Sequence, residues 1–298
     1  MRLYNWHGFV VADELEVPSD GAEFCAELSS VYRKLRRLDP HHPVIGLDCS
    51  ADGCINKKDG FCDIHILDLY PHPQYDGSFM RSIATVLGSM KQVDAAVAPA
   101  GAWFCPEAFT PQDGKSRPIR FREIRGLVFG ALILGATGIL PYKIGDPKTQ
   151  YYASGRNSGI FYAPDMHLGY LKGLGPELRS LEKVLLEPAR FKITADRSEL
   201  LVMRKKHDGG EFLFAVNSGD KPIQCRITAP GLQTQELRVL GEKRRIVLQN
   251  GCFNDRFAPH ETHIYTDDGT FQEAVDIAAL EKEISERDAS ASSARRGQ

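Results

Sequence analysis

The sequence predicts an α/β fold in which a parallel sheet with outer helices precedes an antiparallel β-sandwich. Two observations favour this arrangement. Up to about Leu186, short apolar runs alternate with segments of helical periodicity, in a βα order that repeats about five times. From Arg190 onward, short runs of alternating polar and apolar residues follow one another without helices between them. We therefore expect helices to cover the first sheet and strands alone to build the second part.

In the first part, the extended segments are short and apolar, and the helical segments carry an apolar stripe. In the helix expected at residues 23–39, Leu28, Val31, Leu35 and Leu38 share one face, and Pro40 stops the helix. Further helices are expected at residues 79–93, 118–134 and 171–186. Strands are expected at residues 10–14, 43–47, 63–69, 95–104 and 137–142.

In the second part, the turn Asp208, Gly209, Gly210 predicts a β-hairpin between two of the strands. The expected strands are residues 199–204, 211–216, 223–228, 236–240, 245–248 and 261–265. One helix is expected at residues 273–286, and the polar segment after it should be disordered. The predicted domains are therefore a partial barrel at residues 1–188, a β-sandwich at 189–267, and a short helix with a disordered tail at 268–298.

The composition narrows the class of partner. The 298 residues carry a formal net charge of -2, and 42% of them are hydrophobic. Since there is no basic excess, we expect no nucleic acid and no membrane as partner, and a neutral substrate. An uncharged stretch at residues 126–142 is interrupted by Gly135 and Gly138, which favours a buried helix and strand over a membrane span.

The cysteines indicate neither a disulfide framework nor a metal centre. There are seven of them at irregular spacing, and Cys49, Cys54 and Cys62 form no CxxC pair. We expect mainly free or buried thiols, with an incidental disulfide or metal site as the alternative. The predicted site thus has no metal and no cofactor. No secretion signal is visible, and the compartment stays unpredicted.

Two glutamates lie where apolar runs stop. Glu14 closes the run that begins at Phe9, and Glu107 follows the run that begins at Ala102. A carboxylate at the C-terminal end of a buried strand, among aromatic residues, is how an α/β barrel presents an acid to its substrate. The alternative is that both are ordinary solvated carboxylates, which also occur at strand ends.

Several segments together resemble the (β/α)8 glycoside hydrolase-like proteins, which are related to the cellulase and β-galactosidase barrels. These segments are residues 6–14, 38–44, 63–71, 117–123, 135–139 before Tyr142, and 253–265. The resemblance implies a partial TIM barrel of about strands four to eight, with a C-terminal β-domain. It places residues 10–14 at the fourth barrel strand and residues 102–107 at the seventh. In retaining enzymes of this architecture, these strand ends carry the acid/base, here Glu14, and the nucleophile, here Glu107.

The chemistry requires two carboxyl groups. Departure of a leaving group from a sugar needs a proton donor, and the oxocarbenium ion needs a carboxylate on the opposite face of the ring. Tyr70, His72, Trp103 and Tyr142 are the expected sugar-contacting wall, because aromatic faces stack on pyranose rings. Each of these residues alone could equally be core or rim packing.

Two aspartates complete the predicted site. Asp13 stands before Glu14 where the characterised enzymes usually have Asn, and we expect it to contact substrate. Asp68 could orient a histidine or act as an alternative nucleophile, or it could cap the loop after its strand.

A start at the fourth strand would leave the barrel without its first three βα units. Five parallel strands cannot close a barrel, and their open edges could support self-association. We expect the chain to be the C-terminal part of a longer protein, with an open sheet as the alternative. Two functions stay open. In one, the full-length parent protein is a retaining glycoside hydrolase that cleaves the O-glycosidic bonds of a β-linked oligosaccharide or polysaccharide. The other is a non-catalytic carbohydrate-binding or scaffolding remnant.

Overall fold

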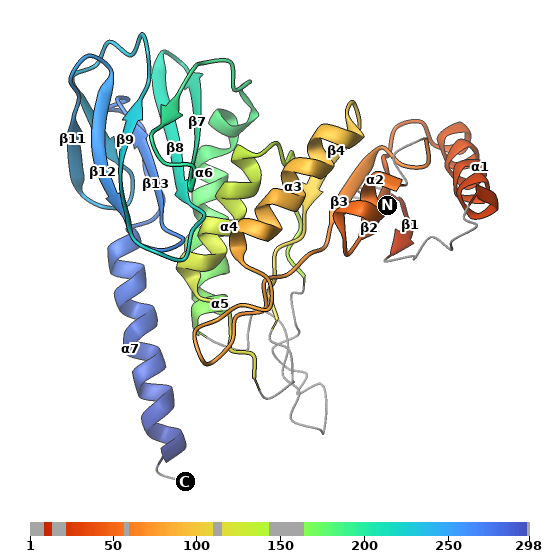
Figure 1. Ribbon diagram of the computed structural model, residues 1–298, viewed down its shortest axis with the longest axis horizontal. Helices are drawn as coiled ribbons and strands as arrows, with labels where there is room; N and C mark the ends of the chain where they lie inside the picture. The colour runs from red at the N-terminus through yellow and green to blue at the C-terminus, as the bar shows by residue number, and fades with distance from the viewer. Residues whose placement is uncertain (1–8, 14–21, 57–59, 110–114, 143–163, 297–298) are drawn as a thin grey trace, which may run out of the picture.

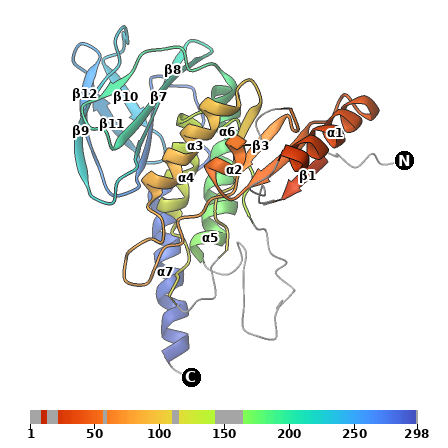
Figure 2. The same cartoon turned by 45° about the vertical axis from the view of Figure 1, so that its right-hand side comes forward.

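The computed structural model describes residues 9–13, 22–56, 60–109, 115–142 and 164–296. Two regions of different secondary structure lie side by side (Figure 1). One is a parallel sheet with helices near the N-terminus, and the other consists of two antiparallel sheets toward the C-terminus. Helices α3 (Ile83–Val97) and α4 (Phe121–Ile133) lie between them, as Figure 2 also shows from a second direction.

The first sheet has five strands in sequential order, and every pair of neighbours is parallel. This confirms the predicted parallel half of the fold. The strands are β1 (Phe9–Asp13), β2 (Val44–Asp48), β3 (Ile64–Leu67), β4 (Gly101–Phe104) and β5 (Gly138–Ile139).

Helices pack against one face of this sheet. They contact the face that carries Val44, Leu67, Ala102 and Phe104, all of which are buried. Their bounds are α1 (Ala22–Leu38), α2 (Ala51–Asn56), α3 (Ile83–Val97) and α4 (Phe121–Ile133). The opposite face carries a smaller cluster around Ile45, Ile66 and Cys105. In a closed barrel this second face would point inward.

Helix boundaries differ from the expected ones at two places. The helix expected at 79–93 begins at Ile83, because Ser82 caps it by accepting a hydrogen bond from the Thr85 N–H. It then runs to Val97, so that β4 is shorter than the extended segment expected at 95–104. The last helical segment of this part is continuous from α5 (Pro164–Leu168) through the π-helix η1 (Gly169–Leu174) to α6 (Gly175–Leu186).

The second region is a β-sandwich, as predicted. One sheet has the strand order β11-β10-β13-β8-β7 and the other the order β12-β9-β6. The strands are β6 (Thr194–Ala195), β7 (Leu200–His207), β8 (Gly210–Asn217), β9 (Ile223–Thr228), β10 (Glu236–Val239), β11 (Arg244–Val247), β12 (Cys252–Phe257) and β13 (Thr262–Thr266).

All residues of strand β8 are buried. Leu213 and Ala215 face the second sheet. Phe212 and Phe214 face the other way, into the core that contains α4, where Phe214 stacks on Phe129. The larger sheet is therefore covered on both faces, and one continuous core joins it to the barrel-like part.

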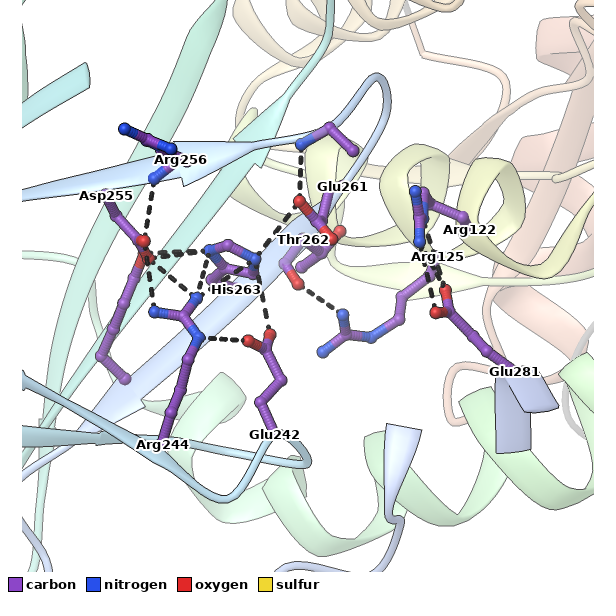
Figure 3. Close-up of polar contacts among 12 residues, drawn as sticks. Arg122, Arg125, Glu242, Arg244, Asp255, Arg256, Glu261, Thr262, His263 and Glu281 are labelled. Carbon is purple, nitrogen blue, oxygen red and sulfur yellow. Dashed lines mark hydrogen bonds and ion pairs between the residues drawn. The ribbon is translucent and has the colours of Figure 1, made fainter. Parts of the chain in front are cut away.

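Buried charges also connect the two regions. The Arg125 side chain on α4 donates to the Glu177 carboxylate on α6 and to the Thr262 carbonyl at the start of β13. Nearby, Arg122 pairs with Glu281 of the C-terminal helix α7 (Ile277–Arg296; Figure 3). Their contacts fix α4 against α6, the β-sandwich and α7.

Helix α7 (Ile277–Arg296) corrects the prediction for the C-terminus. It begins four positions later than expected and continues to Arg296, through the segment 291–296 that was expected to be disordered. Ile277, Leu280 and Ile284 anchor its first turns against Phe121 and Leu168. Within the described part of the chain, no helix is long and apolar enough to cross a membrane.

Candidate functional site

The candidate site lies beyond the C-terminal ends of β3, β4 and β5. Past these strands the chain continues in register: Glu107 forms an isolated parallel bridge with Tyr142. The Ala108 N–H donates to the Tyr142 carbonyl at 2.6 Å, and the Tyr142 N–H donates to the Pro106 carbonyl at 3.1 Å. These bonds bring the predicted residues Glu107 and Tyr142 to one edge of the sheet.

Glu107 is the most completely buried charged residue of this edge, with no exposed surface. Its Oε2 accepts a hydrogen bond from the His72 backbone N–H at 3.0 Å, and the His72 Nδ1 atom lies 3.4 Å from the same oxygen. Its Oε1 has no hydrogen-bond partner among the described residues. Burial raises the pKa of Glu107, and the contact with His72 opposes that shift. The carboxyl is thus desolvated and held at one oxygen.

His72 holds this contact in an unusual backbone conformation. Its φ is 45°, in the left-handed region that residues other than glycine rarely adopt. The conformation is fixed by hydrogen bonds that its carbonyl accepts from the Met80 N–H at 3.1 Å and from Gln74 Nε2 at 2.9 Å. Strained residues of this kind concentrate at active sites and ligand clamps.

An aromatic cluster surrounds the Glu107–His72 contact. The Tyr70 and His72 ring centroids lie 5.5 Å apart. Phe109 contacts Tyr70, His72 and Tyr142, with ring centroids at 5.0, 5.7 and 5.8 Å. Tyr142 is 49% exposed, whereas Tyr70 and His72 are partly buried. The structure therefore brings three of the four predicted wall residues together around Phe109, which the sequence reasoning did not single out.

Trp103 lies on the same face of the sheet but nearer the middle of β4. It packs with Tyr70 against the cluster of Ile45, Ile66 and Cys105. The indole covers Gly138 of β5 so closely that a Cβ atom there would lie 2.5 Å from it. A role in sugar binding for Trp103 stays a prediction.

Asp68 is buried at the end of β3. It hydrogen-bonds the Tyr70 hydroxyl and the Cys105 thiol. Burial and these neighbours raise the pKa of both Tyr70 and Cys105 far above their usual ranges. Both groups stay protonated at neutral pH, so Tyr70 presents a hydroxyl rather than a phenolate to the site.

The structure describes only part of the pair Asp13 and Glu14, which the sequence analysis places at the fourth barrel strand. Asp13 is the last residue of β1 and so lies at the same sheet edge as Asp68 and Glu107. Its side chain and the whole of Glu14 lie outside the described residues. Their assignment stays a prediction.

No protein-family model and no curated protein matches this sequence. Solved structures do match, at low identity. One is a GH27 β-L-arabinopyranosidase from Geobacillus stearothermophilus, with 9% identity, a TM-score of 0.52, and coverage of 88% of this chain and 59% of that chain. A variant of this enzyme in complex with arabinose gives 10% identity, the same TM-score, and coverage of 87% of this chain and 57% of that chain.

A further match is a protein assigned as an α-galactosidase or melibiase from Bacteroides fragilis. It has 13% identity and a TM-score of 0.51, and the match covers 87% of this chain and 54% of that chain. This chain thus spans between a half and two thirds of the length of these solved structures. The likeness shows the fold alone: a partial α/β barrel followed by a β-sandwich.

Proposed function

We propose that this protein is a glycoside hydrolase that cleaves O-glycosidic bonds with retention of configuration, with Glu107 as nucleophile and Glu14 as proton donor. The observation that carries the proposal is the state of Glu107: a desolvated carboxyl at a strand end, with one oxygen held by His72 and aromatic rings around it. The chain has a fold similar to that of the matched glycoside hydrolases, which supports this class of reaction.

The proposed reaction uses the two Glu107 oxygens differently. The His72 N–H holds Oε2, and Oε1 attacks the anomeric carbon as the bond to the leaving oxygen breaks. Glu14 gives its proton to that oxygen, then takes a proton from the water that hydrolyses the glycosyl-enzyme. Because Glu107 must be ionised to attack, its raised pKa should move the acidic limb of the rate profile to higher pH than for an ordinary glutamate.

The burial of Glu107 also sets a requirement on the reaction. Since the carboxyl has no contact with solvent in this structure, a sugar can reach it only after the surrounding residues move. Tyr142, half exposed at the outer side of the cluster, offers the first aromatic surface for a sugar ring. We propose that stacking on Tyr142 and Phe109 precedes contact with Glu107.

A paired role also depends on the shape of the sheet. Strands β1 and β4 are three strand spacings apart, which is about 14 Å along a flat sheet. Retention requires about 5 Å between the two carboxyls. The proposal therefore needs the sheet to curve, as barrel strands do, so that the ends of β1 and β4 converge.

The experiment compares three proteins on a panel of aryl glycosides: the unmodified chain, Glu14→Gln and Glu107→Gln. We expect Glu107→Gln to abolish turnover of every substrate, because no glycosyl-enzyme can form. Glu14→Gln should slow substrates with poor leaving groups by several orders of magnitude but spare activated ones in the first step. Glu182→Gln, at an exposed position of α6, is the matched control and should behave as the unmodified protein.

Two results would contradict the proposal. Retained turnover in Glu107→Gln would remove Glu107 from the reaction. Binding of oligosaccharides by the unmodified chain without cleavage of any aryl glycoside would favour the alternative, a non-catalytic carbohydrate-binding protein.

A further inference from the structure

A π-helical turn interrupts the long helix that follows the barrel-like part. Six residues, Gly169–Leu174, have π geometry between the α-helical segments α5 and α6. Such turns are rare and occur frequently at functional sites. The turn contains Tyr170, which reaches the candidate site.

Tyr170 is buried, and its hydroxyl donates a hydrogen bond of 2.8 Å to the main-chain carbonyl of Glu107. Burial and the neighbouring Glu107 carboxyl raise the pKa of Tyr170 well above its usual value. The hydroxyl therefore keeps its proton at neutral pH. Two bonds from different elements then hold Glu107: Tyr170 holds its backbone, and the His72 N–H holds its carboxyl.

The helix on either side of the turn is fixed independently. Gly169 and Gly173 lie so close to the Phe121 ring of α4 that a Cβ atom would come within 2.9 and 2.6 Å of it. On the C-terminal side, the pair between Glu177 and Arg125 fixes α6. Because one residue of α-helix corresponds to a rotation of about 100°, the π turn decides whether Tyr170 faces Glu107 or another direction.

We propose that Tyr170, presented by the π turn, is a positioning residue for Glu107. Locking the carbonyl of Glu107 fixes the peptide plane at the end of β4 and thereby the direction of its carboxyl. This inference rests on the proposed function for its catalytic consequence, but its structural consequence, a changed environment of the Glu107 carboxyl, can be measured without turnover.

The test is Tyr170→Phe, which removes only the hydroxyl. Without that bond, we expect the end of β4 to loosen and water to approach the carboxyl, so that the pKa of Glu107 falls toward the ordinary glutamate range. Carboxyl carbon NMR titration of isotopically labelled protein measures this directly, with Glu107→Gln identifying the resonance. In turnover, kcat should fall by about tenfold to a hundredfold with little change in KM, as expected for a misplaced reacting group.

Tyr32→Phe is the matched control, because it removes a tyrosine hydroxyl that donates a 2.8 Å bond to Asp63, near α1. It should leave the Glu107 titration and kcat unchanged. A second variant deletes Leu171, an exposed residue of the π turn, and should produce the same change in titration as Tyr170→Phe by rotating Tyr170 away.

The outcomes separate the two proposals. If Tyr170→Phe lowers the Tm but leaves the Glu107 titration and kcat as in the control, Tyr170 merely satisfies a buried carbonyl and the inference is overturned. If the unmodified protein cleaves no aryl glycoside, the proposed function fails. The NMR titration then still decides whether Tyr170 positions Glu107.

Discussion

Replacing Arg125 by Met should destabilise this protein strongly, because the buried Glu177 carboxylate then loses its positively charged partner. Arg125 is 4% exposed and donates to both oxygens of Glu177, at 2.7 and 2.9 Å, and Glu177 is 6% exposed. The Met side chain fills similar space but leaves the Glu177 carboxylate buried without its cation. Breaking a buried pair in this way costs about 3–5 kcal/mol.

The expected change is large enough to measure by thermal unfolding. For a chain of this size, each kcal/mol corresponds to a change in Tm of about 2–4 °C, so the variant should lose roughly 6–20 °C. Arg122→Met provides the matched control, since Arg122 on the same helix forms a pair with Glu281 that is 40% and 37% exposed. Such surface pairs are worth about 1 kcal/mol or less.

The double variant Arg125→Met with Glu177→Met tests the cause. With both charges removed, most of the lost stability should return, because apolar replacements of buried pairs are often neutral. A loss of Tm in Arg125→Met no larger than in Arg122→Met would refute the reasoning. So would a double variant as unstable as the single one.

Three more predictions concern stability. Burial raises the pKa of Glu107 in the folded state. The contribution of this group to stability is therefore full below its unfolded pKa and is lost as pH rises through its folded pKa. Glu107→Gln should remove this pH dependence, measured by urea unfolding between about pH 4 and pH 8. Burial alone would lower the pKa of His263, but bonds to Asp255 and Glu261 more than offset it and raise it (Figure 3). The stability that this group contributes should therefore fall as pH rises through its folded pKa, and His263→Gln should flatten this fall. Urea midpoints that change equally with pH in the variant and the unmodified protein would contradict the prediction. Phe129→Ala, at a fully buried position, should cost about 3–5 kcal/mol in the same assay, and a cost under about 1 kcal/mol would contradict the described core.

The fold class could be predicted from periodicity because most elements bury one face or one stripe. The parallel order of β1 to β5 follows from strands that alternate with helices. Strand β8 was found despite its continuous burial, since the Asp208 to Gly210 turn marks its start. The strand expected at residues 223–228 has the observed bounds of β9. The short helix α2 and strand β12 were not predicted, because six residues carry little periodic signal.

The candidate site was predictable only as far as the strand-end rule reaches. That rule placed Glu107, Asp68 and Tyr70 at one sheet edge, and the structure brings them together there. Phe109 could have been found by alternation, since it lies two residues beyond Glu107. Tyr170 could not, because its contact spans 63 positions and depends on a π turn for which the sequence has no known signature.

The central claim is that Glu107 forms a bond to the sugar. A fluorinated aryl glycoside that reacts quickly but releases its sugar slowly would trap the glycosyl-enzyme, and mass spectrometry of a digest would locate the label. The account predicts one sugar per chain, attached to Glu107, and no label in Glu107→Gln. A label on Asp68, or turnover of the glycoside with no labelled carboxylate at all, would contradict it.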